Sequence, residues 1–134
     1  MIILFTLPAA LNAQTLNKKR VKFGDDFVKA VNAKKRKKVL RMCDESYRKD
    51  QLKFLNGDEE QFLDELFSGI DQDSEEYVSV KFDDIQSFEL VEIGHEDVEG
   101  VVYQFIIRSN GKEILITLLL KVHGKTYGFE GASG

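Results

Sequence analysis

The sequence predicts an α+β domain in which three N-terminal helices pack on an antiparallel sheet. In roughly the first half of the chain, apolar residues recur at three- and four-residue spacing, which is typical of helices. From Tyr77 onward the pattern changes to strand-like runs, and Asn110-Gly111 separates the two longest of them. Such a dipeptide between strand-like runs is the strongest short signal of a β-hairpin. Helices and strands in separate blocks indicate the α+β class.

Residues 1–13 are predicted to be a secretory signal peptide. Residues 1–11 are apolar apart from Thr6 and Pro8, and the small residues Ala10 and Ala13 follow at a typical cleavage spacing. The run is shorter than the roughly 20 residues that cross a bilayer. Cleavage after Ala13 would leave residues 14–134 as one domain, periplasmic or secreted, with no membrane insertion. The alternative is that the run forms an N-terminal strand or a buried helix.

Two helices are expected before residue 50, separated by a short break at Asn32-Ala33. The apolar residues of the first are Phe23, Phe27, Ala30 and Val31, and those of the second are Val39, Leu40, Met42, Cys43 and Tyr47. A third helix should begin after Asp58, which is a candidate N-cap with Gln61 three residues on. Its apolar face is Phe62, Leu63, Leu66 and Phe67, and Gly69 is expected to stop it.

Two strands are expected next, over residues 77–82 and 85–93. Two hairpins follow, with turns at Asn110-Gly111 and His123-Gly124. A turn at Asn110-Gly111 places Ser109 opposite Lys112 and Arg108 opposite Glu113. A second turn at His123-Gly124 would place Tyr127 opposite Leu120 and Phe129 opposite Leu118. Both turns then agree on one buried face, which consists of Val101, Tyr103, Phe105, Ile107, Ile114, Ile116, Leu118, Leu120, Tyr127 and Phe129.

The net charge of −4 hides a strong asymmetry along the chain. Residues 18–41 contain eleven Lys and Arg but two acids, whereas residues 44–99 contain four Lys and Arg and nineteen acids. The basic run at residues 34–38 is of a kind that binds nucleic acid or anionic lipid. Because no aromatic residue is interleaved in it to stack on bases, no nucleic-acid partner is expected. A solvated helix face is the favoured interpretation, and a basic module for anionic surfaces is the alternative.

The cysteine and histidine residues give little sign of a metal or cofactor, and neither is expected. Cys43 is the only cysteine, so an intrachain disulfide is excluded, and a small buried apolar residue is favoured over a reactive thiol. His95 lies beside Glu96, Asp97 and Glu99, which are metal-binding residue types. A plain acidic turn is the favoured interpretation. His123 falls in a predicted turn, where we expect only a surface role.

Three stretches carry a resemblance to the nuclear transport factor 2-like superfamily, also called the cystatin-like fold. FVKAVNAKKRKKVLRMCDESY resembles its opening pair of helices, NGDEEQFLDELF its third helix, and KVHGKTYGFEG its closing hairpin. The resemblance spans roughly residues 20–130 and suggests an exported bacterial member. It implies a sheet curled around helices to form a cone-shaped pocket. Members that resemble this fold include isomerases, dehydratases and proteins that only bind, so the fold does not decide the function.

The expected ligand pocket is aromatic, lined by Tyr103, Phe105, Tyr127, Phe129, Tyr47 and Phe62. Catalytic proteins resembling this fold place Asp, His or Tyr on the inward sheet face, but this inward face contains no carboxylate and no histidine. A non-catalytic exported domain that binds a small apolar ligand or a protein partner is therefore the favoured function. The alternative is an isomerase or dehydratase whose general base is Asp44, Glu45 or Asp50 near the pocket mouth.

The opposite face of the first hairpin is expected to form a homodimer interface. Its centre is apolar, with Val102, Ile106, Leu115 and Leu119, and charged residues lie toward its ends. An apolar centre with a charged rim is typical of protein interfaces. The resemblance also implies dimerisation through the sheet face turned away from the helices. A different protein, or the N-terminal segment of this one, is the alternative cover.

Overall fold

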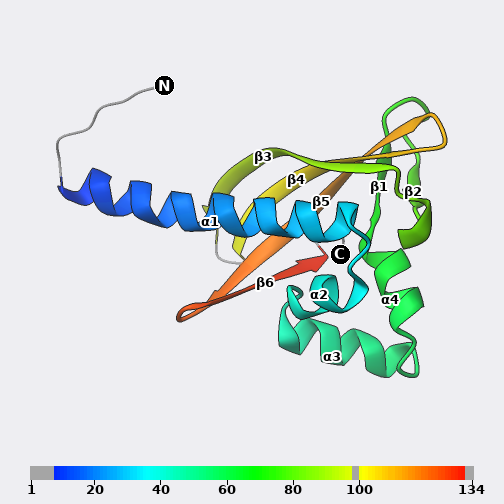
Figure 1. Ribbon diagram of the computed structural model, residues 1–134, viewed down its shortest axis with the longest axis horizontal. Helices are drawn as coiled ribbons and strands as arrows, with labels where there is room; N and C mark the ends of the chain where they lie inside the picture. The colour runs from blue at the N-terminus through cyan, green and yellow to red at the C-terminus, as the bar shows by residue number, and fades with distance from the viewer. Residues whose placement is uncertain (1–7, 98–99, 132–134) are drawn as a thin grey trace.

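The computed structural model describes residues 8–97 and 100–131 and confirms the predicted class. In these residues, helices pack against one side of a curved, unclosed antiparallel sheet, and the strands on either side of Asn110-Gly111 form a hairpin (Figure 1). The elements in chain order are α1 (Pro8–Asn32), α2 (Arg36–Arg41), α3 (Glu45–Phe54), α4 (Glu59–Leu66), β1 (Ser68–Asp71), β2 (Tyr77–Ser79), the 3₁₀ helix η1 (Phe82–Asp84), β3 (Ser87–Asp97), β4 (Gly100–Ser109), β5 (Lys112–His123) and β6 (Thr126–Gly131).

The first helix ends at the predicted break. Helix α1 ends at Asn32, whose side-chain amide donates to the carbonyl of Phe88 at 2.8 Å and accepts from the Phe88 N–H at 2.9 Å. This pair of hydrogen bonds fixes the end of α1 to the start of β3. At its other end, α1 runs through the predicted cleavage position after Ala13. Among the described residues, no helix is long and apolar enough to cross a membrane.

The predicted second helix is wrong as a single element, because the chain leaves the helical path at residues 42–44. The N–H of Asp44 donates to Phe129 O at 2.7 Å, and the N–H of Phe129 donates to Met42 O at 2.9 Å. This segment therefore pairs with β6 and divides the prediction into α2 and α3. Asp44 then caps α3, because its carboxylate accepts the Tyr47 N–H at 3.1 Å.

The predicted start of the next helix is confirmed, but its predicted end is wrong. Asp58 caps α4 through its side chain, which accepts the Gln61 N–H at 3.0 Å. The helix ends at Leu66, before Gly69, which lies in the unpredicted strand β1. A β-carbon on Gly69 would lie 2.0 Å from Leu115 O, so glycine is required for β1 to approach β5.

The sheet is built on the hairpin of β4 and β5, whose predicted register is confirmed from Val101↔Leu120 to Ser109↔Lys112. Asn110 and Gly111 both have positive φ, of 51° and 76°, as the tight hairpin turn requires. Strands are ordered β2-β1-β5-β4-β3, and β6 also pairs with β5. The strand predicted over residues 77–82 is shorter, because β2 ends at Ser79 and Phe82 begins η1.

The register predicted for the second hairpin is wrong by two residues. Leu120 pairs with Phe129 and Val122 with Tyr127, while His123 pairs with Thr126. Gly124, with φ of 64°, is therefore the first residue of the turn, where a positive φ is needed, and His123 lies outside it. A shift of two residues keeps each side chain on its face. Phe129 is accordingly buried on the predicted side of the sheet.

An aromatic cluster fills the space between the helices and the sheet. The Phe27 ring lies 4.6 Å from the ring of Phe129 and 5.8 Å from that of Phe105, measured between centroids. Phe105 in turn stacks on Phe88 at 4.7 Å. These four rings are at most 2% exposed. The predicted inward face of β4 and β5 is thus confirmed as the core.

Candidate functional site

Four of the six residues predicted to line a ligand pocket lie in the core. Tyr103, Phe105, Phe129 and Phe62 are at most 2% exposed. The hydroxyl of Tyr103 donates to Arg20 O at 2.8 Å, and burial raises the pKa of this phenol well above its ordinary value. These four aromatic side chains therefore pack against other residues of the protein and do not line an open pocket of the predicted kind. Among the hollows in the described residues, Tyr47 lines one beside the core and Tyr127 lines a second. A smaller hollow of about 270 Å³ adjoins the first, and Phe62 is part of its lining.

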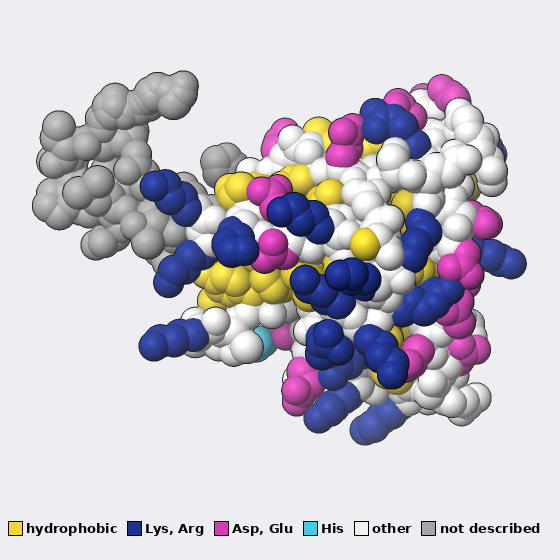
Figure 2. Space-filling view, viewed as in Figure 1, with side chains coloured by type: hydrophobic (Ala, Val, Ile, Leu, Met, Phe, Trp, Pro, Cys, Tyr) yellow, Lys and Arg dark blue, Asp and Glu magenta, His cyan; other side chains and the backbone are white. Residues whose placement is uncertain are grey.

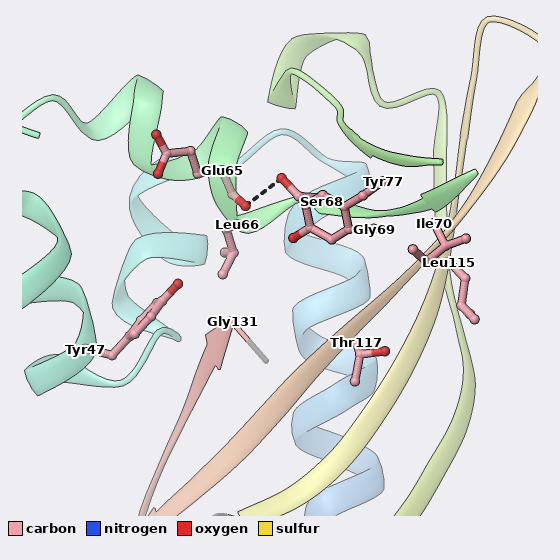
Figure 3. Close-up of a pocket in the computed structure, with 10 residues that line it drawn as sticks. All are labelled: Tyr47, Glu65, Leu66, Ser68, Gly69, Ile70, Tyr77, Leu115, Thr117 and Gly131. Carbon is pink, nitrogen blue, oxygen red and sulfur yellow. Dashed lines mark hydrogen bonds between the residues drawn. The ribbon is translucent and has the colours of Figure 1, made fainter. Parts of the chain in front are cut away.

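The first hollow, which we call the notch, has a volume of about 340 Å³ and opens between β1 and β6 (Figure 3). Its lining comes from α3, α4 and four strands: Tyr47, Glu65, Leu66, Ser68, Gly69, Ile70, Tyr77, Leu115, Thr117 and Gly131. Figure 3 shows Tyr47 on α3 and Thr117 on β5 at opposite sides of it. Tyr47, which was predicted as a ligand residue, is thus at a cavity, although a different one.

The notch exists because two strands share one edge of β5. β1 pairs with β5 at Ile114 and Leu115, whereas β6 pairs with it from Leu118 to His123. Between these pairings, Ile116 and Thr117 have no cross-strand partner on that edge in the described chain. No sequence pattern predicts this gap, because β1 is short and contains no run of alternating apolar residues.

The notch combines apolar walls with a few polar groups, as ligand-binding cavities do. Leu66, Ile70 and Leu115 supply apolar surface. Burial raises the pKa of Tyr47, so its hydroxyl remains neutral through the physiological range, and a neutral hydroxyl can both donate and accept a hydrogen bond. Ser68 Oγ donates to Glu65 O at 2.8 Å and lies 2.7 Å from Ser79 Oγ. These contacts fix the polar rim between α4 and β1.

The second hollow, of about 550 Å³, contains a carboxylate–imidazole pair. His123 Nε2 lies 2.9 Å from Asp44 Oδ1, and the Asp44 side chain is 8% exposed against 68% for His123. We call this cavity the Asp44–His123 hollow; the remaining lining is Arg41, Cys43, Glu45, Ser46, Arg48, Thr126, Tyr127 and Gly128. His123 is exposed, as expected, but its contact with the buried Asp44 was not predicted. Its partner is 79 residues away in the sequence.

Gly128 makes this pairing possible. A β-carbon at Gly128 would lie 2.6 Å from Asp44 Cα, so a larger residue would push β6 away from the segment before α3. Glycine at this position lets Phe129 form its backbone hydrogen bonds with Asp44 and with Met42. Of the other two acids predicted as candidate bases, Glu45 is exposed and lines this hollow, whereas Asp50 is exposed on α3. None of the three acids predicted as a general base therefore lies in the aromatic core. Asp44 lines the Asp44–His123 hollow beside the core.

Cys43 is buried, as the favoured interpretation predicted. Its side chain faces the Val39 carbonyl, with Sγ 3.4 Å from the oxygen. Burial raises the pKa of the thiol to about 12, so it stays protonated at neutral pH. A protonated thiol is a weak nucleophile, and Cys43 therefore contributes packing rather than reactivity to the hollow.

The residues predicted as a dimer interface lie on the outer face of the sheet, but they are not equally accessible. Val102, Ile106 and Leu115 are partly buried, whereas Leu119 is only 8% exposed. Cross-strand pairing extends the apolar row from Ile106 through Leu115 to Ile70 and Tyr77. The last two are 39% and 56% exposed and were not predicted. The exposed apolar surface therefore lies nearer β1 and β2 than expected.

No metal site is found in the described part of the chain, where no group of three or more His, Cys, Asp or Glu residues converges. His95 and Asp97 lie in β3 rather than in a turn, and their side chains are outside the described residues. Glu99 is also outside them.

Comparisons of this chain with protein-family models, with curated proteins and with solved structures found no match. The function is therefore inferred from the geometry of the described residues.

Proposed function

We propose that this protein is a non-catalytic, exported binding domain of nuclear transport factor 2-like type that binds a small, mainly apolar molecule in the notch. The gap between β1 and β6 is the observation that carries the proposal. Its volume of about 340 Å³ is within the range of small-molecule sites. Leu66, Ile70 and Leu115 provide the apolar contact, and the neutral Tyr47 hydroxyl provides a directional hydrogen bond.

Indole, a small apolar probe with one hydrogen-bond donor, should shift the methyl NMR signals of Leu66, Ile70 and Leu115. Thr117→Phe should weaken this binding at least about tenfold, because the larger side chain fills the notch. Thr117 is half-buried on a strand, where phenylalanine is tolerated.

Thr126→Phe is the matched control, since it adds the same volume beside the Asp44–His123 hollow and should leave indole binding unchanged. Equal binding by wild type and Thr117→Phe would contradict the proposal.

The same experiment tests the alternative of an isomerase or dehydratase. The Asp44–His123 pair favours it, since a buried carboxylate that orients an imidazole is an arrangement used in general acid–base catalysis. The pair lies in the other hollow, whereas the apolar lining is concentrated in the notch. If Thr126→Phe, and not Thr117→Phe, blocks indole binding, the ligand site is the Asp44–His123 hollow and the enzyme becomes the better proposal.

Export is supported by the apolar run and the small residues that end at Ala13. Mass spectrometry of the protein from its natural host should find Gln14 at the N-terminus, and an intact Met1 in cytosolic material would exclude export.

We also propose a homodimer formed through the outer sheet face. The exposed Ile70 and Tyr77 continue the apolar row of Ile106 and Leu115, and burying such a row is favourable. Arg108 pairs with Glu89 and Glu113 at 2.9 Å, which places charges at one end of the row.

Light scattering over a dilution series should give a dimer mass for the wild type and a monomer mass for Ile106→Lys with Leu115→Lys. Phe54→Lys is the control, because Phe54 is 82% exposed on α3, away from this face, and its replacement should leave the dimer intact. A monomer at every wild-type concentration would rule the dimer out.

A further inference from the structure

The fold divides the basic run at residues 34–38 into cations with internal partners and cations that face solvent. The Lys34 ammonium donates to the Ile85 carbonyl and lies 5.7 Å from the centre of the Phe82 ring. The Arg36 guanidinium lies 5.1 Å from the same ring and pairs with Asp83 and with Glu60. These two side chains therefore hold α2 to η1 and α4.

The other three cations of the run are available for a partner. Lys35, Lys37 and Lys38 are exposed, and no ion pair to them is found among the described side chains of residues 18–94 and 101–131. An exposed arginine, Arg41, follows at the end of α2. Lys34 and Arg36 therefore hold the fold together, whereas no ion pair is found for the other three cations of the run, or for Arg41, among the side chains that the structure describes.

Helix α1 adds a second group of exposed cations. Lys18, Lys22 and Lys29 are four and seven residues apart, which places them along one side of the helix. Val21, which is 43% exposed, lies in the same strip. The strip also contains two acids: Asp25 is exposed, and Asp26 is partly buried and paired with Lys22 at 3.0 Å. Figure 2 shows Lys and Arg side chains gathered over α1 and α2 on one face of the molecule. We call the exposed cations of residues 18–41 the basic face.

The chemistry of the basic face suits an extended layer of phosphate groups. Most of its charges are lysines, whose compact ammonium groups act as point charges and do not need the planar geometry that arginine recognises. Phe23 and Phe27 of α1 turn toward the core, where they pack on Phe129, so they are not presented for stacking on nucleic-acid bases. The strip on α1 is a shallow helical surface that includes an apolar contact at Val21. Basic residues interspersed with apolar ones on a helical surface are typical of binding at a lipid interface.

We propose that the basic face binds reversibly to the phosphate headgroups of an anionic phospholipid membrane. The binding is peripheral: the lysines lie at the headgroups and the domain stays outside the bilayer. The choice of lipid rather than nucleic acid as the partner rests in part on the proposed export. The exposure of the cations is independent of that proposal. Because the notch and the basic face share no residue, the two sites can be tested separately.

The test is sedimentation of the full chain with vesicles of phosphatidylcholine alone and with roughly one third phosphatidylglycerol. Each lysine at an anionic surface strengthens binding about fivefold. Lys35→Gln with Lys37→Gln and Lys38→Gln should therefore weaken binding to the anionic vesicles by about a hundredfold. Wild-type binding should also fall steeply at high salt, because the charges are screened.

Lys53→Gln with Lys81→Gln and Lys125→Gln is the matched control, since these three exposed lysines lie outside the basic face and carry the same total charge. It should bind like the wild type. Three results would overturn the proposal: equal binding to neutral and anionic vesicles, equal loss in both triple variants, or binding to a DNA duplex without binding to anionic vesicles. Loss of indole binding by the Thr117→Phe variant while vesicle binding persists would show that the two sites are independent.

Discussion

Replacing Phe105 with alanine should lower the free energy of unfolding by about 3–5 kcal/mol, since it removes a large buried ring and leaves a cavity. Phe105 has no exposed surface. Its ring centroid lies 4.7 Å from that of Phe88 and 5.8 Å from that of Phe27, so rings from the sheet and from α1 would both lose a neighbour. Urea denaturation followed by circular dichroism measures the change.

Phe54→Ala is the control for this substitution. The Phe54 side chain is 82% exposed at the end of α3. The same chemical change there should alter the free energy of unfolding by at most about 0.5 kcal/mol. A cost below about 1 kcal/mol for Phe105→Ala would mean that β4 does not turn this side chain into the core.

Raising the pH from 9 to 12 should remove up to about 4 kcal/mol of stability through Cys43 alone. Burial raises the pKa of the folded thiol from 9.0 to about 12. Above pH 9 the unfolded chain therefore releases a proton that the folded chain still holds, and ionisation favours unfolding. The free energy of unfolding should fall by as much as about 1.4 kcal/mol per pH unit in this window.

Cys43→Ala isolates the contribution of the thiol. Its loss of packing should make the variant less stable than the wild type at pH 7, but the difference should shrink as the pH rises above 9. Burial also raises the pKa values of Tyr47 and Tyr103. Tyr103 affects both proteins alike, whereas the charge of the Cys43 thiolate adds to the raised pKa of Tyr47, so the comparison reports the thiol together with this coupling. Urea titrations with a reductant present, repeated at each pH, give the two curves; parallel curves would contradict the assigned burial of the thiol.

The features that could be predicted from the sequence are those that a few neighbouring residues determine. Asn110-Gly111 defines a hairpin, because both residues readily adopt the positive φ that the tight turn needs. Asp58 marks the start of α4, because its carboxylate reaches an N–H three residues away. Alternating side chains then assign the buried face of β4 and β5. For these elements, local chemistry and the final packing agree.

The features that were missed depend on residues far apart in the chain. The pattern of residues 42–44 predicts a helix, but the Asp44 N–H donates to the Phe129 carbonyl and the Met42 carbonyl accepts from the Phe129 N–H. Strand β1 forms because Gly69 fits against Leu115, and nothing within four residues of sequence signals that contact. The Asp44–His123 pair likewise required the correct register of the last hairpin, in which Gly124 rather than His123 begins the turn. Both hollows result from these long-range pairings.

The pairing of residues 42–44 with β6 also protects the protein against uncontrolled association. A strand with a free edge can add the strand of another molecule and start aggregation. Here the hydrogen bonds from Asp44 and Phe129 cover the outer edge of β6. Of the two edges that end the strand order, β2 is only three residues long, and β3 is interrupted by irregular register around Val91 and after Ile93. Short and bulged edges are poor templates for strand addition, so open-ended growth through sheet edges is disfavoured while the broad outer face remains free to form a closed contact.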